Sequence, residues 1–157
     1  MTTKKRIYLA GPFFDKDQVK RLDNIQQLLE QNPTVDKVFR PASLDYTSAE
    51  FGSFEWQTAI FKHDINNINS SDIVVAMVDY KTEANEFEPD SGTMFECGYA
   101  FANNVPVIGV RYKSDLPLNL MLAGSFTAFF NGMDSIEQIK DYNFETLMTR
   151  YEDIDVF

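Results

Sequence analysis

The chain has 157 residues, of which 44% are hydrophobic and 14% aromatic, and its formal net charge is −10. A chain of this length fits one domain over residues 1–157, and its apolar content excludes wholesale disorder. The negative charge argues against nucleic acid and anionic membranes as partners, because both attract clustered Lys and Arg side chains.

The numbers of Cys and His residues limit which disulfides and metal sites the chain can form. The chain has one Cys and one His, so no disulfide can form within it and a His-based metal cluster is excluded. The N-terminal residues pass from charged positions directly into "RIYLAGPFF", which is too short an apolar run for a signal peptide. No segment approaches the length of a membrane span. We therefore expect a soluble, cytoplasmic protein.

Short apolar runs alternate with helical patterns along the chain. The run "DIVVAMVD" is typical of a strand buried on both faces, and Leu22, Ile25 and Leu28 recur at helical spacing. In chain order we expect a strand over 6–10, a helix over 16–32, a weaker strand over 36–42, a helix over 54–69, a strand over 72–79, a long acidic loop over 80–90, a helix opening at 91–93 and running to 104, strands over 105–110 and 126–130, and amphipathic helical pieces to the C-terminus.

This alternation predicts an α/β fold, with a doubly wound, mainly parallel five-stranded sheet and helices on both faces, like Rossmann and flavodoxin folds. Ligands of such sheets bind at the carboxyl ends of the strands. The loops after Ala10, Ala42, Asp79 and Arg111 are therefore the places to look for a site.

The loop after the first strand reads "AGPFFD". It lacks the repeated glycines of a phosphate-binding loop, and Phe13 and Phe14 suit a flat, neutral ligand better. The alternative is that both rings merely cover the edge of the sheet. Tyr8 either points its hydroxyl into the crevice or packs in the core.

Glu96 lies among apolar residues in the helix that opens at 91–93, with Asp90 just upstream and almost no Lys or Arg nearby. One interpretation is a capping box, in which Glu96 reaches back to the amide of Thr93. The other is a site, because the helix start aims Glu96 at the crevice and the helix dipole favours its ionised form. An ionised carboxylate beside a second, protonated carboxyl is the arrangement of a nucleophile and an acid.

Asp64 falls in line with the apolar residues Trp56, Ile60 and Ile68 at helical spacing. A buried Asp is costly, which makes it a site candidate; the alternative is a pairing with His63 or with solvent. Asp64 is expected to reach the site only if its helix is broken or kinked before it. Asp72, His63 and Cys97 are interpreted as structural.

Taken together, the motifs resemble the nucleoside 2-deoxyribosyltransferase family. The matching segments are "IYLAGPFF", "FKHDINNINSSDIVVAMVD", "PDSGTMFECGYA", "NNVPVIGV" and "LPLNLM", in the right order over most of the chain. The signature D-S-G-T-x-x-E-x-G-Y-A is the most specific of them.

The resemblance implies transfer of a 2-deoxyribosyl group between nucleobases, purine or pyrimidine, with 2′-deoxynucleosides and free bases as substrates. Glu96 would be the nucleophile, holding the sugar as a covalent ester, and two inversions would give net retention. Tyr8 would position Glu96, while Asp90 and Asp64 would hydrogen-bond the base and handle its proton. Phe13 and Phe14 would flank the substrate.

The resemblance also implies a homo-oligomer, either a hexamer or a dimer. Asn119, with Met121 beside it, would come from a neighbouring subunit to orient Glu96 and close the pocket. The family requires no cofactor or metal. A net-negative site suits this chemistry, since an oxocarbenium-like transition state is cationic.

Two other functions compete with transfer. A related hydrolase would cleave the N-glycosidic bond of deoxynucleosides or deoxynucleoside 5′-monophosphates with water, but the monophosphate needs a phosphate cradle that "AGPFFD" scarcely supplies. A receiver-like signalling module would need paired acids after the first strand and a Lys after the last. Those positions read "AGPFFD" and "FFNGMD" instead.

Overall fold

The computed structural model describes residues 3–41, 45–79 and 89–157. Its elements in chain order are β1 (Lys5–Ala10), α1 (Lys16–Gln31), β2 (Val35–Phe39), α2 (Phe54–Ser70), β3 (Ile73–Met77), α3 (Ser91–Ala102), β4 (Val107–Arg111), α4 (Leu120–Ser125), β5 (Phe126–Asn131), α5 (Met133–Ile136) and the 3-10 helix η2 (Glu137–Asp141). Among these helices none is long and apolar enough to cross a membrane.

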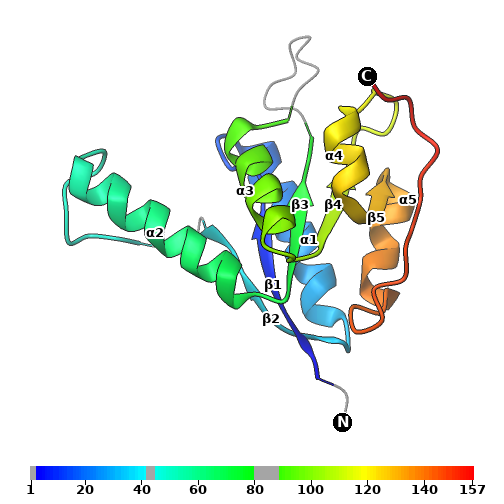
Figure 1. Ribbon diagram of the computed structural model, residues 1–157, viewed down its shortest axis with the longest axis horizontal. Helices are drawn as coiled ribbons and strands as arrows, with labels where there is room; N and C mark the ends of the chain where they lie inside the picture. Colours follow the sequence, from blue (N-terminus) through cyan, green and yellow to red (C-terminus); the bar gives the residue numbers. More distant parts are fainter. Residues whose placement is uncertain (1–2, 42–44, 80–88) are drawn as a thin grey trace.

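The five strands form one parallel sheet in the order β2-β1-β3-β4-β5 (Figure 1). In the register of β1, Tyr8 lies between Phe39 of β2 and Val74 of β3. The predicted doubly wound α/β fold is therefore confirmed.

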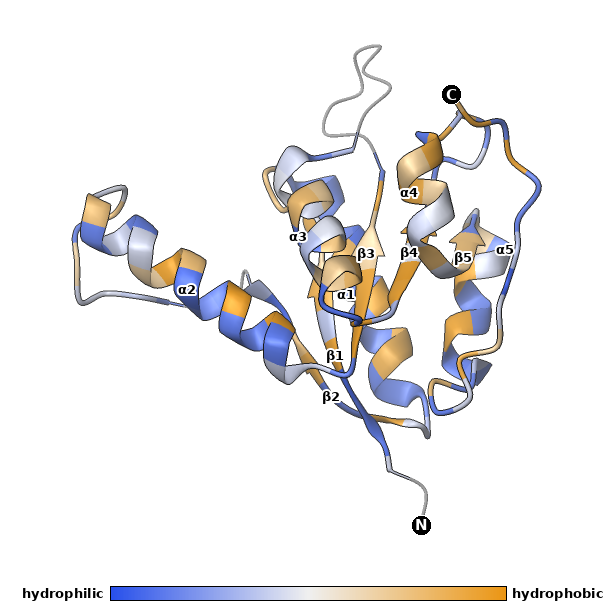
Figure 2. Ribbon diagram, in the orientation of Figure 1, coloured by the Kyte–Doolittle hydropathy of each residue, from blue (hydrophilic) through white to orange (hydrophobic). Residues whose placement is uncertain are grey.

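Each face of the sheet carries its own apolar core, because successive side chains of a strand point to opposite faces. One core packs the β-strand residues in register with Ile7 and Leu9 against α1, α5 and η2. The other packs those in register with Tyr8 and Ala10 against α2, α3 and α4. Figure 2 shows β3 and β4 coloured as hydrophobic, as expected for strands covered on both faces.

The two cores define where a ligand fits. The chain leaves β1 toward α1 on one face, and it leaves neighbouring β3 toward α3 on the other face. Connections that diverge in this way open a crevice at the carboxyl ends of the two strands. Gly11 begins the loop after β1, and a Cβ there would lie 2.8 Å from Leu22 Cδ2, so a side chain at this position would require Leu22 of α1 to shift.

Several predicted boundaries were wrong. The strand expected over 36–42 ends at Phe39, and Ala42 lies outside the described residues, as does most of the loop expected over 80–90. The short helix α4 was not predicted. After η2, the last helical piece, residues 142–157 run without helix along the side of the sheet.

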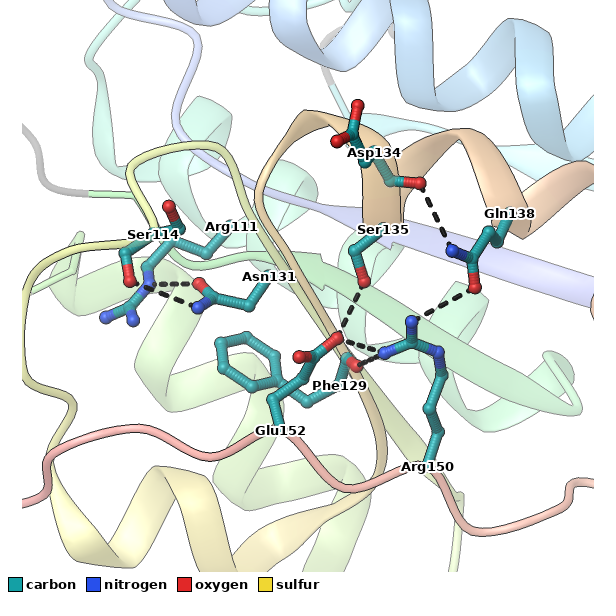
Figure 3. A network of polar contacts seen from close by, with 9 residues as sticks. All are labelled: Arg111, Ser114, Phe129, Asn131, Asp134, Ser135, Gln138, Arg150 and Glu152. Atoms are coloured by element: carbon teal, nitrogen blue, oxygen red, sulfur yellow. Dashed lines mark hydrogen bonds and ion pairs between the residues drawn. The ribbon is translucent and has the colours of Figure 1, made fainter.

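This C-terminal strap, residues 142–157, is held to β5 by backbone and side-chain hydrogen bonds. The amide of Phe129 donates to the carbonyl of Arg150, and the Arg150 guanidinium donates back to the carbonyl of Phe129 at 2.8 Å. The same guanidinium pairs with Glu152, which also accepts from the Ser135 hydroxyl at 2.7 Å (Figure 3). These bonds replace the helix that the amphipathic pattern predicted.

Candidate active site

The centre of the candidate site is a hydrogen bond between Tyr8 and Glu96. Tyr8 is fully buried on β1, and its hydroxyl donates to Oε1 of Glu96 on α3, 88 residues further along the chain. Burial raises the pKa of Tyr8, and the neighbouring Glu96 carboxylate raises it further. Tyr8 therefore stays protonated and acts as a hydrogen-bond donor to the carboxylate.

Glu96 does not form the capping box that local spacing allowed. The N-cap of α3 is Asp90, whose Oδ2 accepts from the amide of Thr93 at 2.9 Å and from its hydroxyl at 3.2 Å. Thr93 is thus already inside the helix, and Glu96 lies one turn further on. There its side chain points toward Tyr8 rather than toward the helix end.

The charge state of Glu96 is set by burial more than by the helix dipole. Burial raises the pKa of Glu96 to about 7; the hydrogen bond from Tyr8 opposes this rise, and the nearby carboxyls of Asp64 and Asp90 add to it. The dipole acts mainly within the first turn of a helix, and Glu96 lies beyond it. The carboxyl can therefore exist in both charge states near neutral pH.

Asp64 reaches the site from an unbroken helix. α2 runs continuously from Phe54 to Ser70, so the expected break before Asp64 was wrong. Figure 1 shows the reason: α2 begins well outside the sheet and runs toward it, so that only its second half lies beside the sheet. Oδ1 of Asp64 is buried and has no hydrogen-bond partner in the described residues. Burial raises the pKa of this carboxyl, and His63 lowers it.

In the described part of the chain, Asp64, Asp90 and Glu96 form no salt bridge. Its ion pairs all lie elsewhere, and they are Arg6–Asp72, Arg21–Asp79, Arg40–Asp23 and Arg150–Glu152. Asp90 is only 7% exposed. The site thus concentrates three acids whose negative charges are balanced by no nearby described Lys or Arg.

The aromatic pair Phe13 and Phe14 lies in the loop between β1 and α1. The rings stack on each other at 5.6 Å between centroids, and they are 43% and 64% exposed. The loop is fixed by Gln18, which accepts from the Phe14 amide at 2.7 Å, and by Asp15, which caps α1. The rings therefore remain available at the carboxyl edge of the sheet and do not pack into the core.

Asn119 and Met121 lie at the start of α4, on a different part of the surface. The Asn119 side chain accepts from the Met121 amide at 2.9 Å and so caps α4, and Met121 is 80% exposed. Both border an apolar hollow of about 630 Å³ that Met94 and Phe101 of α3 line from the other side. In the described residues of one chain, neither side chain makes a hydrogen bond to Tyr8, Asp64 or Glu96.

Two further sets of contacts were not predicted. His63, interpreted as structural, packs its ring on Phe39 at 5.3 Å, and Phe39 packs on Tyr8 at 5.5 Å. Buried Asp79 accepts from the amides of Tyr112 and Lys113 and fixes the chain after β4. The position of Asp79 directly after an apolar strand was the available sequence signal; the ring contacts had none, because they join three separate elements.

The fold and the site together define a class: a doubly wound α/β protein with a tyrosine-bound, partly buried carboxylate and a second carboxyl at the crevice of its sheet. The family model for nucleoside 2-deoxyribosyltransferases matches residues 7–133. A nucleoside deoxyribosyltransferase of Limosilactobacillus fermentum is 33% identical, with 92% of this chain and 89% of that protein covered.

Other known proteins agree. A nucleoside deoxyribosyltransferase of Lactobacillus leichmannii is 28% identical, with 90% of each chain covered. The structure of a 2-deoxyribosyltransferase from Bacillus psychrosaccharolyticus matches with a TM-score of 0.80 and 31% identity, covering 94% of this chain and 98% of that one. The chain belongs to the nucleoside 2-deoxyribosyltransferase family, as its motifs predicted.

Proposed function

We propose that this protein transfers the 2-deoxyribosyl group of a nucleoside from one nucleobase to another, with Glu96 as the nucleophile. The observation that carries the proposal is the hydrogen bond from buried Tyr8 to Glu96, in a site that Asp64 and Asp90 also face. A carboxylate held in one orientation by a neutral donor is suited to attack a carbon atom rather than to cap a helix.

The reaction proceeds in two displacements. An oxygen of Glu96 forms a bond to C1′ of the sugar while the bond from C1′ to the base nitrogen breaks, and the electron pair leaves with the base. A nitrogen of the second base then attacks C1′, and the ester bond breaks to restore the Glu96 carboxylate. Each displacement inverts C1′, so the configuration is retained overall.

Asp64 supplies and removes the proton in this proposal. Its raised pKa keeps a proton on the carboxyl closer to neutral pH, from which the departing base takes it. The carboxylate then receives the proton that the incoming base loses. Asp90, whose Oδ2 is already held by Thr93, has a fixed orientation from which to hydrogen-bond the base.

Transfer is tested by incubating the protein with thymidine and adenine, and separately with thymidine alone. Deoxyadenosine is expected to form with the wild type and not with Glu96→Ala. Glu30→Ala serves as the matched control, because Glu30 is an exposed glutamate of α1. Release of thymine without a new nucleoside would instead indicate a hydrolase, and a purine donor such as deoxyinosine extends the test to the other class of base.

A homo-oligomer in which Asn119 and Met121 complete a neighbour's site is also part of the proposal. Support comes from large apolar side chains along α2, α3 and α4, each more than half exposed, namely Phe61, Phe95, Phe101, Leu120 and Met121. Apolar surface of this extent commonly marks an interface. A second copy that covers it would bring these two residues of α4 toward another subunit's Glu96.

Mixed oligomers test this arrangement. Glu96→Ala and Asn119→Ala are each expected to be inactive alone, with light scattering giving the oligomer size. Co-expression of the two variants is expected to restore activity, because some sites then combine an intact Glu96 with a neighbour's intact Asn119. A monomer, or mixed oligomers as inactive as their parents, would contradict shared sites.

A further inference from the structure

The Tyr8 ring packs against Phe39 of β2 on one side. Tyr8 and Phe39 are directly paired in the register of β1 and β2, so their side chains project from the same face of the sheet. Their ring centroids lie 5.5 Å apart with an interplanar angle of 31°. Because β2 is an edge strand, no strand lies beyond Phe39 on this side of Tyr8.

The outer side of Phe39 is covered by α2. The His63 ring lies 5.3 Å from the Phe39 ring at an interplanar angle of 59°, and His63 precedes Asp64 on the same helix. Phe39 therefore lies between the strand that carries Tyr8 and the helix that carries Asp64. Its ring thus contacts one residue from each of the two elements whose side chains meet at Glu96.

We propose that Phe39 is a positioning residue of the active site, which holds the Tyr8 ring so that its hydroxyl stays on Oε1 of Glu96. The inference rests on the proposed role of Glu96. A phenol ring pivots at its Cβ, so a small tilt into the space left by a missing Phe39 ring moves the hydroxyl at the far end. Since a misplacement of about 1 Å can cost about 100-fold in rate, Phe39→Ala is expected to lower kcat by about 10- to 100-fold.

A double-mutant cycle with Tyr8 separates positioning from general packing. If Phe39 acts through the Tyr8 hydroxyl, Phe39→Ala lowers kcat in the wild type but changes it by less than about twofold in Tyr8→Phe, where no hydroxyl remains to be misplaced. Val38→Ala is the matched control, because Val38 lies on the same strand and packs into the opposite core. It is expected to leave kcat unchanged.

The pH profile gives a second readout. The titratable groups that act on Glu96 are Tyr8 from β1, Asp64 from α2 and Asp90 ahead of α3, and His63 acts on Asp64. The Tyr8 hydrogen bond favours the ionised carboxylate, so Phe39→Ala is expected to move the acid limb of kcat/KM to higher pH, in the direction that Tyr8→Phe moves it. Packing damage alone would lower the rate without moving the limb.

Phe39→Leu completes the series and applies if Phe39→Ala fails to fold, since leucine keeps apolar bulk on β2 without a flat ring. It is expected to show a smaller loss with the same dependence on Tyr8. Equal losses in the wild-type and Tyr8→Phe backgrounds, or an equal loss in Val38→Ala, would overturn the inference. An active Glu96→Ala would overturn the proposed function itself, whereas an inactive Glu96→Ala with an additive cycle would overturn only the role of Phe39.

Discussion

Replacing Glu96 by glutamine should stabilise the protein at alkaline pH while removing its activity. Glutamine has nearly the same shape and its amide oxygen accepts the Tyr8 hydrogen bond, but it carries no charge. Wild-type Glu96 is ionised at pH 8 in a site whose burial disfavours that form. The variant therefore avoids the free energy that the wild type spends on an ionised, partly buried carboxylate.

The size of the effect follows from the pKa of Glu96. Burial raises it from the ordinary 4.5 to about 7, which corresponds to about 3 kcal/mol. An acid with a raised pKa contributes stability that is fully present below about pH 4.5 and is lost as the pH rises to about 7. Glu96→Gln should thus match the wild type at pH 4 and exceed it by about 3 kcal/mol at pH 8.

Urea unfolding at pH 4, 6 and 8 and at one fixed protein concentration measures this difference. Glu30→Gln, on the exposed end of α1, controls for the removal of one negative charge from a net-negative chain. Equal unfolding free energies of Glu96→Gln and wild type at pH 8 would refute the reasoning. So would a gain that is as large at pH 4 as at pH 8, because it could not come from ionisation.

Three further predictions concern Tyr8, Asp64 and Asp90. The kcat/KM of transfer should have an acid limb near pH 7, because Glu96 must be ionised to attack. Tyr8→Phe should move this limb to higher pH, because the hydrogen bond lowers the pKa of Glu96; an unmoved limb would contradict the contact. Asp64→Asn should slow transfer from thymidine by about 100- to 10,000-fold, but far less from 7-methyl-2′-deoxyguanosine, whose base leaves without protonation. Equal losses with both donors would remove Asp64 as the acid. Asp90→Ala should cost about 1 kcal/mol in urea unfolding as a lost N-cap, whereas Asp90→Ser keeps the cap; full activity in Asp90→Ser would show that Asp90 does not contact the base.

The sheet was largely predictable from sequence, and its surroundings were less so. β3 and β4 are short, apolar and buried on both faces, so each stands out in the sequence as a continuous apolar run. α4 was missed because six residues, Leu120–Ser125, are too few for a helical period to show. The C-terminal strap was missed because its conformation comes from hydrogen bonds to β5, to which no local pattern points.

The site shows the same division between local and distant causes. The spacing considered for a cap of α3 was that of Thr93 with Glu96. In the structure Asp90 caps α3 through the Thr93 amide, and the hydroxyl of Tyr8, 88 residues away, donates to the Glu96 carboxylate. The expected break before Asp64 assumed a helix that starts at the sheet edge, whereas α2 starts beyond it (Figure 1). The partner of Glu96 and the path of α2 both depend on residues more than one turn away from the side chain concerned, which local spacing does not report.

The strap also determines how the protein would respond to proteolysis. It pairs with the outer side of β5, the strand at one margin of the sheet, through Phe129 and Arg150. Cleavage within the strap would leave the amides and carbonyls of a phenylalanine-rich strand open to pairing with another molecule. Nicked protein should therefore first be detected as insoluble aggregate, and the material that remains in solution should retain the turnover rate of the intact chain.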